Sequence, residues 1–196
     1  GVVGALSPLE GRVAFGTSSR DDIAYLPQQS EIDWTFPLSV IDLVAMGLWS
    51  EIGPFGQLKG DRLARVEAAV AAMGLMGFEN RPIGSLSGGQ MQRTLFARLL
   101  LQDASLILLD EPSMGLAPQL VEEIFEIVKR LNEAEGVTFL LAEQNTTMAL
   151  RYANYGYILE NGRVVMDGEA ADLAENEDVK EFYLGVSGEG RRSFRN

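Results

Sequence analysis

Two segments near the middle of the 196-residue chain constrain its fold more than any other feature. Residues 86–93 read LSGGQMQR, and residues 105–112 read SLILLDEP. Paired glycines that open a helix point backbone N–H groups and the positive end of the helix dipole at an anion. An apolar run that ends in two acids puts carboxylates at the carboxyl end of a buried strand, where open α/β sheets bind ligands. The pair predicts an α/β protein with an anion-binding site.

Composition excludes several classes of chemistry. The chain has no Cys and no His, which excludes disulfides, thiol catalysis, His-based acid–base catalysis and His metal sites. Its net charge of -12 argues against a nucleic-acid partner, which would need clustered Lys and Arg. With 46% hydrophobic residues the chain can build a core, and its apolar runs are shorter than the roughly 20 residues of a membrane helix.

The order of the predicted elements favours a mostly parallel sheet. A capping box predicts a helix over 39–48, and apolar residues at helical spacing predict another over 119–134. A short apolar strand follows over 137–142, and two further strands, 155–159 and 163–166, flank an Asn-Gly turn. Strands that alternate with helices indicate a parallel sheet covered on both faces.

Together the two segments resemble the signature and Walker B motifs of ABC transporter ATPases, and the resemblance extends over nearly the whole chain. It implies an α/β P-loop NTPase fold with an inserted helical subdomain. Residues 1–29 and 86–196 would form the RecA-like catalytic core, and residues 30–85 the helical subdomain.

The resemblance assigns roles to the residues of both motifs. Asp110 would hold Mg²⁺, and Glu111 would accept a proton from the attacking water. The signature residues would complete the ATP site of a partner subunit: Ser87, Gly88, Gly89 and Gln90. The alternatives are structural: a buried strand that ends in solvated acids, and a helix start at which Ser87 is the N-cap and Gln90 its N3 partner.

Two glutamines complete the expected site. The sequence YLPQQ at 25–29 resembles the family's Q-loop, in which Gln28 would reach Mg²⁺ and the water. Gln144 stands where most ABC ATPases have a switch histidine. Glutamine can donate a hydrogen bond to a γ-phosphate, but it cannot carry a proton near neutral pH. Residues 113–118 also lack the aspartate of the commoner D-loop.

The two halves resemble different branches of the family. Residues 23–103 are similar to ATPases of manganese, zinc or iron importers, whereas the chain from Ser113 onward is similar to those of branched-chain amino-acid or urea importers. The change falls near 108–112, a segment that both branches share. A chimera or recombinant joined at the Walker B motif is the hypothesis.

One motif that such an ATPase needs is not found. A Walker A loop reads G-x-x-x-x-G-K-[ST], and the chain has no Gly-Lys dipeptide. The resemblance aligns residues 1–6 with the helix after that loop, so we expect the preceding strands and the loop to be cut off. We therefore expect the chain alone neither to bind ATP tightly nor to hydrolyse it, and the strand 137–142 to form an exposed apolar edge.

The function implied is the nucleotide-binding subunit of an ABC importer. ATP and Mg²⁺ would be its cofactors, and its partners a second ATPase subunit and transmembrane permease subunits at the cytoplasmic face of the membrane. Two alternatives stay open: an ABC protein of another class, such as a ribosome-associated or DNA-repair ATPase, and a non-enzymatic remnant. The substrate, metal cation against amino acid or urea, stays open as well.

Overall fold

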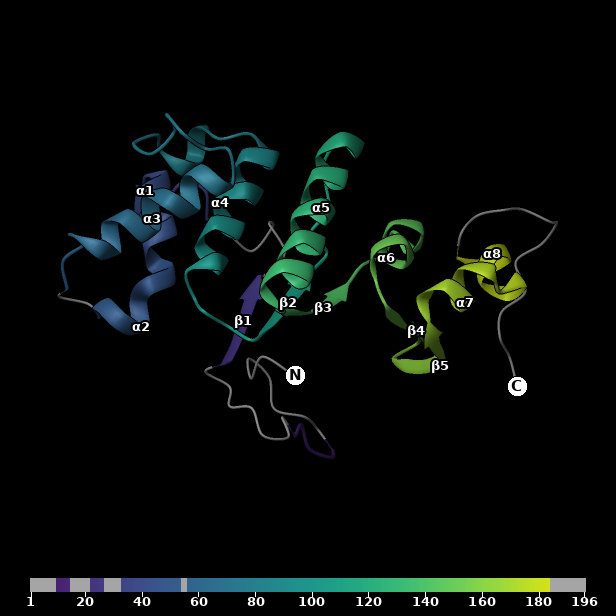
Figure 1. The fold of residues 1–196 in the computed structure, drawn as a ribbon. Helices are drawn as coiled ribbons and strands as arrows, with labels where there is room; N and C mark the ends of the chain where they lie inside the picture. The colour runs from purple at the N-terminus through teal and green to yellow at the C-terminus, as the bar shows by residue number, and fades with distance from the viewer. Residues whose placement is uncertain (1–9, 15–21, 27–32, 54–55, 184–196) are drawn as a thin grey trace. The chain divides into compact units, whose positions relative to one another are not determined.

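A computed structural model describes residues 10–14, 22–26, 33–53 and 56–183, and Figure 1 shows its ribbon. The chain folds into two compact units, residues 1–142 and residues 143–196. The elements of the first unit are β1 (Ile23–Leu26), α1 (Val40–Ala45), η3 (Met46–Leu48), α2 (Trp49–Ile52), α3 (Asp61–Ala72), η4 (Ile83–Ser85), α4 (Gly88–Leu100), β2 (Leu106–Asp110), α5 (Pro118–Glu135) and β3 (Thr138–Ala142). The second unit contains α6 (Thr146–Tyr152), β4 (Tyr155–Glu160), β5 (Arg163–Glu169), α7 (Ala170–Glu175) and α8 (Glu177–Phe182).

The first unit contains a parallel sheet with the strand order β1-β2-β3. Leu106 of the central strand pairs with Ile23 on one side and with Thr138 on the other. The three middle residues of β2 are buried, as expected for a strand of a covered parallel sheet. The predicted parallel α/β arrangement is therefore confirmed. Among the described strands β3 lies at the sheet edge, and Leu140 on it is 47% exposed.

Helices α1, α3 and α4 pack together around an apolar core (Figure 1). Each contributes side chains that are almost wholly buried: Val40, Val44, Val66, Val70, Met91, Leu95 and Phe96. The same cluster reaches the sheet through Ala24 and Leu26 of β1 and Ile107 and Leu109 of β2. The N-terminal half of α4 is thus anchored against both the other helices and the sheet. The subdomain boundaries at residues 30 and 85 stay a prediction.

The helices begin and end close to their predicted limits. The capping box between Ser39 and Asp42 opens α1, which ends at Ala45 and continues as the 3-10 turn η3 rather than as α-helix to residue 48. In that turn Gly47 lies directly against α4, where a Cβ would stand 2.3 Å from the carbonyl oxygen of Arg98. Helix α5 ends at Gly136, whose φ of 68° is left-handed, as a helix C-cap requires.

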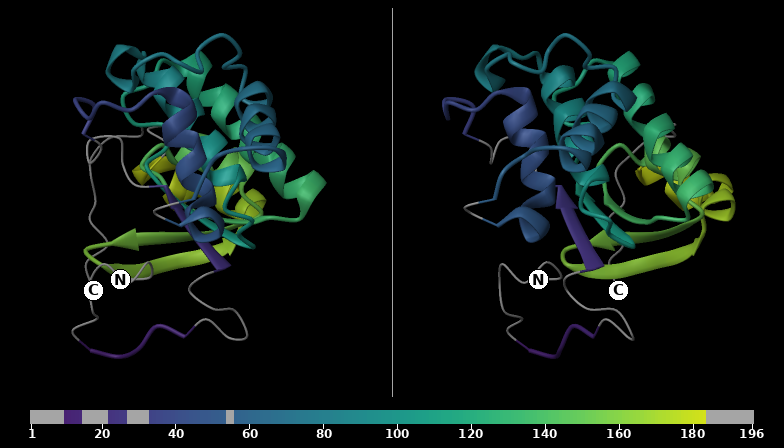
Figure 2. Two further views of the ribbon diagram at one scale, coloured as in Figure 1. Left: turned by 90° about the vertical axis from the view of Figure 1, so that its left-hand side faces the viewer. Right: turned by 60° about the vertical axis from the view of Figure 1, so that its left-hand side comes forward.

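In the second unit, β4 and β5 form the predicted hairpin, seen as adjacent ribbons in both views of Figure 2. Asn161 and Gly162 form its turn with φ values of 50° and 76°, as a type I′ turn demands. Helix α7 packs on one face, where a Cβ on Gly156 would meet Leu173 at 2.7 Å. The other face exposes apolar side chains, Tyr157 and Leu159 among them.

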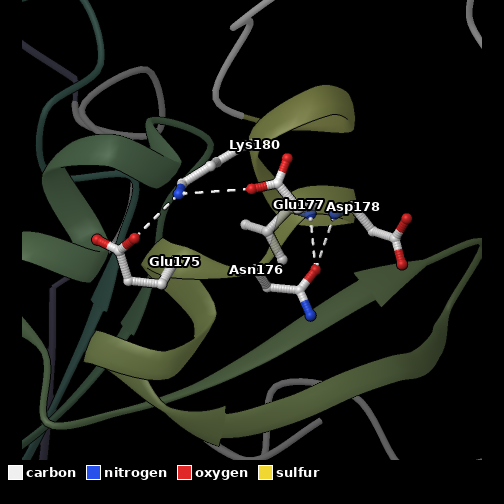
Figure 3. A network of polar contacts seen from close by, with 6 residues as sticks. Glu175, Asn176, Glu177, Asp178 and Lys180 are labelled. Carbon is white, nitrogen blue, oxygen red and sulfur yellow. Dashed lines mark hydrogen bonds and ion pairs between the residues drawn. The ribbon is translucent and has the colours of Figure 1, made fainter.

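Polar contacts define the junction of α7 and α8 (Figure 3). The Asn176 side-chain oxygen accepts hydrogen bonds from the backbone N–H groups of Asp178 at 2.9 Å and Val179 at 3.2 Å, which caps α8. Lys180 pairs with Glu175 at 3.0 Å and lies 3.9 Å from Glu177. Because both acids are largely exposed, these pairs add little stability beyond the cap.

None of the described helices combines the length and the apolar character that crossing a lipid bilayer requires.

Candidate functional site

The signature motif forms the N-terminus of α4. Ser87 is the N-cap, and its hydroxyl accepts a hydrogen bond from the Gln90 backbone N–H at 3.3 Å. In return the Gln90 side-chain oxygen accepts from the Ser87 backbone N–H at 2.9 Å. The capping alternative is therefore correct as a description of these two side chains. It is compatible with anion binding, because a capping box leaves the positive end of the helix dipole at the α4 N-terminus.

The second glycine of the pair has a packing role. Gly89 is buried, and a Cβ there would stand 2.5 Å from Cδ1 of Leu120 at the start of α5. One turn further, Arg93 forms an ion pair with Glu123 of α5 at 3.4 Å. These two contacts show that the beginning of α4 lies next to α5, the helix that follows the acidic motif. The motifs at 86–93 and 105–112 are thereby joined through α5.

The first acid, Asp110, is the last residue of β2 and is half-buried. Tyr25 on the neighbouring strand β1 donates a hydrogen bond from its hydroxyl to Asp110 Oδ2 at 3.3 Å. No described residue donates a hydrogen bond to the other carboxylate oxygen. A carboxylate oxygen is a hard ligand that suits Mg²⁺, which usually takes one or two protein carboxylates and keeps several waters. Asp110 therefore fits the role predicted for it.

The second acid, Glu111, has an unusual backbone. Its φ is +44°, in the left-handed region that residues with a Cβ seldom occupy. Its N–H donates to the Ala142 carbonyl at 2.9 Å, and its own carbonyl accepts from the Met114 N–H at 3.0 Å. The strained residue thus lies between the end of the sheet and a tight turn. Such conformations cluster at functional sites, where the surrounding structure imposes them.

Of the two predicted glutamines, the structure describes only Gln144. Gln28 lies outside the described residues. Gln144 belongs to the second unit, between β3 and α6, and is exposed. Its carbonyl accepts a hydrogen bond from the Thr146 N–H at 2.9 Å, and the next residue, Asn145, caps α6. Gln144 is therefore held in a helix-entry turn within its own unit.

The geometry adds two residues, Tyr25 and Leu120, to those that the motifs indicate. Tyr25 belongs to the YLPQQ segment, and its hydrogen bond depends on the parallel register of β1 with β2. Leu120 is one of the apolar residues at helical spacing in 119–134, a pattern that predicts a helix but no contact partner. The hydrogen bond of Tyr25 to Asp110 follows from the pairing of Tyr25 with Leu108, and that pairing can be predicted only when the strand order is known. In the described part of the chain, no cluster of three or more acids, His or Cys suggests an additional metal site.

Comparison with known proteins identifies the family. A sequence profile of the ABC transporter family matches residues 2–114. The zinc transport system ATP-binding protein TroB of Treponema pallidum is 34% identical over 188 residues, which cover 94% of this chain and 70% of TroB. The branched-chain amino-acid transport ATP-binding protein BraG of Pseudomonas aeruginosa is 48% identical over 102 residues, 52% of this chain. The chain spans only 43% of BraG in that match.

Solved structures agree with this result. An ABC transporter in an inward-facing conformation matches 91% of this chain and 68% of its own, with a TM-score of 0.79 and 25% identity. A dimeric bacterial ABC transporter cassette matches 77% of this chain and 64% of its own, with a TM-score of 0.65 and 28% identity. The predicted α/β P-loop NTPase fold is confirmed by these likenesses. The chain therefore belongs to the ABC transporter family, as a protein of its ATP-binding type.

Proposed function

We propose that this chain is part of the ATP-binding subunit of an ABC importer. One observation carries the proposal: a capped Gly-Gly helix start and a Tyr-held carboxylate at the end of β2 occur in one compact unit. The first suits the phosphate of a nucleotide, and the second suits its Mg²⁺. The relatives named as transport ATP-binding proteins support the importer assignment.

Each site residue has a distinct role in this proposal. Asp110 holds Mg²⁺, together with Gln28. A metal ion held there would neutralise negative charge on the phosphates of the nucleotide. Glu111 accepts a proton from the attacking water. Gln144 donates a hydrogen bond to the γ-phosphate, and having no titratable side chain it takes no proton.

The signature residues act on a second subunit. Two copies, or this chain and a related one, enclose ATP so that the α4 N-terminus of one subunit faces the nucleotide held by the other. Residues Ser87 to Gln90 present that terminus, and its dipole favours the developing negative charge. Closure of the dimer moves transmembrane permease subunits at the cytoplasmic face of the membrane, and hydrolysis reopens it. Dimeric cassettes among the similar structures support this assembly.

The transported substrate is either a metal cation or a branched-chain amino acid or urea. Both classes occur among the relatives, and BraG matches 102 residues whereas TroB matches 188. A joint between two lineages near residues 108–112 would explain why both kinds of relative occur. Sequencing reads that cross this segment test the joint, because one uninterrupted native reading frame would count against an engineered origin.

The 196 residues alone should be inactive, because they contain no Gly-Lys dipeptide to hold the β- and γ-phosphates. The test uses two proteins: the chain as printed, and the chain extended at Gly1 by a segment designed to supply a strand and a Gly-Lys-Ser/Thr loop. Phosphate release from Mg-ATP is expected from the extended protein only. Glu111→Gln should abolish it, while Glu133→Gln on the exposed face of α5 should leave it unchanged.

The outcomes separate the rival functions. Hydrolysis by the printed chain that Glu111→Gln abolishes would contradict the proposed inactivity. An extended protein that folds, binds Mg-ATP and shows no hydrolysis would favour the non-enzymatic remnant.

A further inference from the structure

Strand β3 has an open outer edge in the described part of the first unit. It pairs with β2 on one side and with no described strand on the other (Figure 1). Residues 138–142 read TFLLA, with no charged side chain and no proline, and their pairing with β2 runs without a register shift. Proteins usually protect a sheet edge with charges, proline or a bulge, because its unpaired N–H and C=O groups accept a further strand. Strand β3 carries none of them.

The hydrogen bonds to β2 show which backbone groups point outward. The Thr138 N–H donates at 3.0 Å to the carbonyl of the residue before β2, and the Ala142 carbonyl accepts at 2.9 Å from the N–H of the residue after β2. Backbone groups alternate in direction from one strand residue to the next. Those of Phe139 and Leu141 therefore point away from β2, toward the open edge.

This open edge is short. The Asn132 side chain donates a hydrogen bond at 2.9 Å to the carbonyl of Val137, the residue before β3. That carbonyl is therefore satisfied within the unit, and the open edge begins at Phe139. No described residue pairs with the outward N–H and C=O groups of Phe139 or Leu141. A partner that satisfies these groups must itself present an extended backbone with the same spacing.

The side chains of β3 lie on two faces. Phe139 and Leu141 are half-buried against the core cluster of the first unit. Leu140 lies between them on the opposite face and is 47% exposed, and Thr138 and Ala142 on that face are exposed too. A substitution at Leu140 therefore alters the exposed side of the edge without removing a core side chain.

We propose that two copies of this chain pair antiparallel through β3, about a two-fold axis at Leu140. In this register Phe139 of each copy lies opposite Leu141 of the other, so the open groups of both residues exchange hydrogen bonds. Leu140 lies opposite its own counterpart as a non-hydrogen-bonded pair, the kind in which side chains approach most closely.

A second copy suits this edge for reasons of geometry and charge. It presents the same open residues, and a two-fold axis perpendicular to the sheet closes the pair and keeps the core-facing side chains of both copies on one face. At the ends of the segment 137–143 this register sets Glu143 opposite Val137 of the other copy, so within the segment no two like charges lie directly opposite each other. The association requires no nucleotide, so it stands or falls independently of the proposed function.

Sedimentation velocity of the 196-residue chain without nucleotide tests the association. A monomer–dimer equilibrium is expected, and added salt should tighten it because salt screens the repulsion between two copies of net charge -12. Leu140→Lys should weaken it by roughly ten-fold or more, since it sets two like charges opposite each other in place of two Leu. The matched control is Leu159→Lys on the exposed face of the hairpin, which should associate as the unsubstituted chain does.

Disulfide formation measures the register, because the chain has no Cys of its own. Thr138→Cys and Ala142→Cys lie opposite each other in the proposed pairing, within the Cα separation that a disulfide spans. In oxidised glutathione a mixture of the two proteins should therefore link faster than either protein alone. Parallel pairing in register would instead link each variant to itself.

Four results would overturn the proposal. They are a chain that stays monomeric at every concentration, an assembly that grows beyond two copies, a dimer that Leu140→Lys and Leu159→Lys weaken equally, and faster linkage within either Cys variant than between them. The Cys variants keep the test decisive should Leu140→Lys fail to fold, which far-UV circular dichroism would show.

Discussion

The Tyr25 hydroxyl donates a hydrogen bond to Oδ2 of Asp110 at 3.3 Å, across two neighbouring parallel strands. The two residues are 85 positions apart in the sequence. Their contact is made at the carboxyl end of the sheet, where this fold class binds ligands. The carboxylate proposed to hold Mg²⁺ is therefore oriented by β1 as well as by its own strand.

Tyr25→Phe tests this orientation. Removal of one part-buried hydrogen bond should lower the free energy of unfolding by about 1 kcal/mol. In the extended, ATP-competent protein it should also raise the Mg²⁺ concentration needed for half-maximal hydrolysis several-fold. Urea unfolding and a Mg²⁺ titration measure the two effects. Tyr157→Phe, on the exposed face of the hairpin, should change neither, and an unchanged Mg²⁺ requirement in Tyr25→Phe would show that the bond does not position Asp110.

The left-handed backbone of Glu111 predicts that Gly at this position gives a more stable protein than Ala. A Cβ in this conformation costs about 1–2 kcal/mol, against which Gly loses about 0.5–1 kcal/mol of chain entropy. Glu111→Gly should therefore be more stable than Glu111→Ala by about 0.5–1 kcal/mol on these figures, and both should lack hydrolysis. Thermal unfolding of the two variants gives the difference. The pair Asp103→Gly and Asp103→Ala, at φ 50°, is the control and should differ in the same direction without loss of hydrolysis.

Two buried glycines should tolerate substitution by Ala differently: Gly47, which lies against the last turn of α4, and Gly89, which lies in its first turn. A Cβ at Gly47 would meet the Arg98 carbonyl oxygen at 2.3 Å, whereas one at Gly89 would meet the flexible end of Leu120 at 2.5 Å. A backbone carbonyl cannot move aside as a side chain can, so Gly47→Ala should lower the free energy of unfolding by about 1–3 kcal/mol, the usual range for overpacking. Gly89→Ala should lower it by less, since Leu120 can change rotamer. Chemical denaturation ranks them, and the reverse order would contradict this account of the packing.

The two capping boxes of the first unit permit a matched comparison. Ser87→Ala and Ser39→Ala each remove an N-cap oxygen, and each should lower the free energy of unfolding by about 1 kcal/mol. Only Ser87→Ala should weaken ATP-dependent dimerisation of the extended protein, because only α4 carries the paired glycines. Size-exclusion chromatography with Mg-ATP, in the Glu111→Gln background, measures this. If both variants dimerise equally, the α4 N-terminus takes no part in the ATP site.

Tyr155 predicts an effect of high pH on the second unit. Its hydroxyl donates to Asp167 at 2.6 Å, and this hydrogen bond, with smaller contributions from desolvation and the nearby negative charges, raises its pKa to about 12. The native unit favours protonated Tyr155, so this stabilisation is complete below the ordinary value of 10.0 and is lost as pH rises from there to about 12.

An absorbance titration near 295 nm checks the Tyr155 prediction. At pH 11 the folded chain should show less tyrosinate than the Asp167→Asn variant, in which the hydrogen bond to a carboxylate is removed. Far-UV circular dichroism defines the pH range in which both remain folded. Equal absorbance of the two proteins within that range would refute the assignment.

Much of the fold could be predicted because its signals are local. The hairpin turn at 161–162 needs residues that accept positive φ, and Asn-Gly supplies them. Helix α5 ends at Gly136 for a similar reason, because glycine readily adopts the positive φ of a helix C-cap. The helix at 39–48 was predicted as one element and found as two, because the approach of Gly47 to Arg98 depends on how distant segments pack. The exposed edge at β3 was expected from the resemblance, and β3 is indeed at the edge of the described sheet.

The sequence by itself determined the chemistry available to this protein: a Gly-Gly helix start, two adjacent acids after an apolar strand, no His and no Cys. These are properties of residue type and spacing, and local backbone preferences turn them into elements. Tertiary structure alone decided which groups meet. Tyr25 reaches Asp110 because parallel strands bring distant residues into register, and Leu120 lies over Gly89 because the start of α5 approaches the start of α4. Such contacts depend on packing between segments far apart in the chain, which no local pattern specifies.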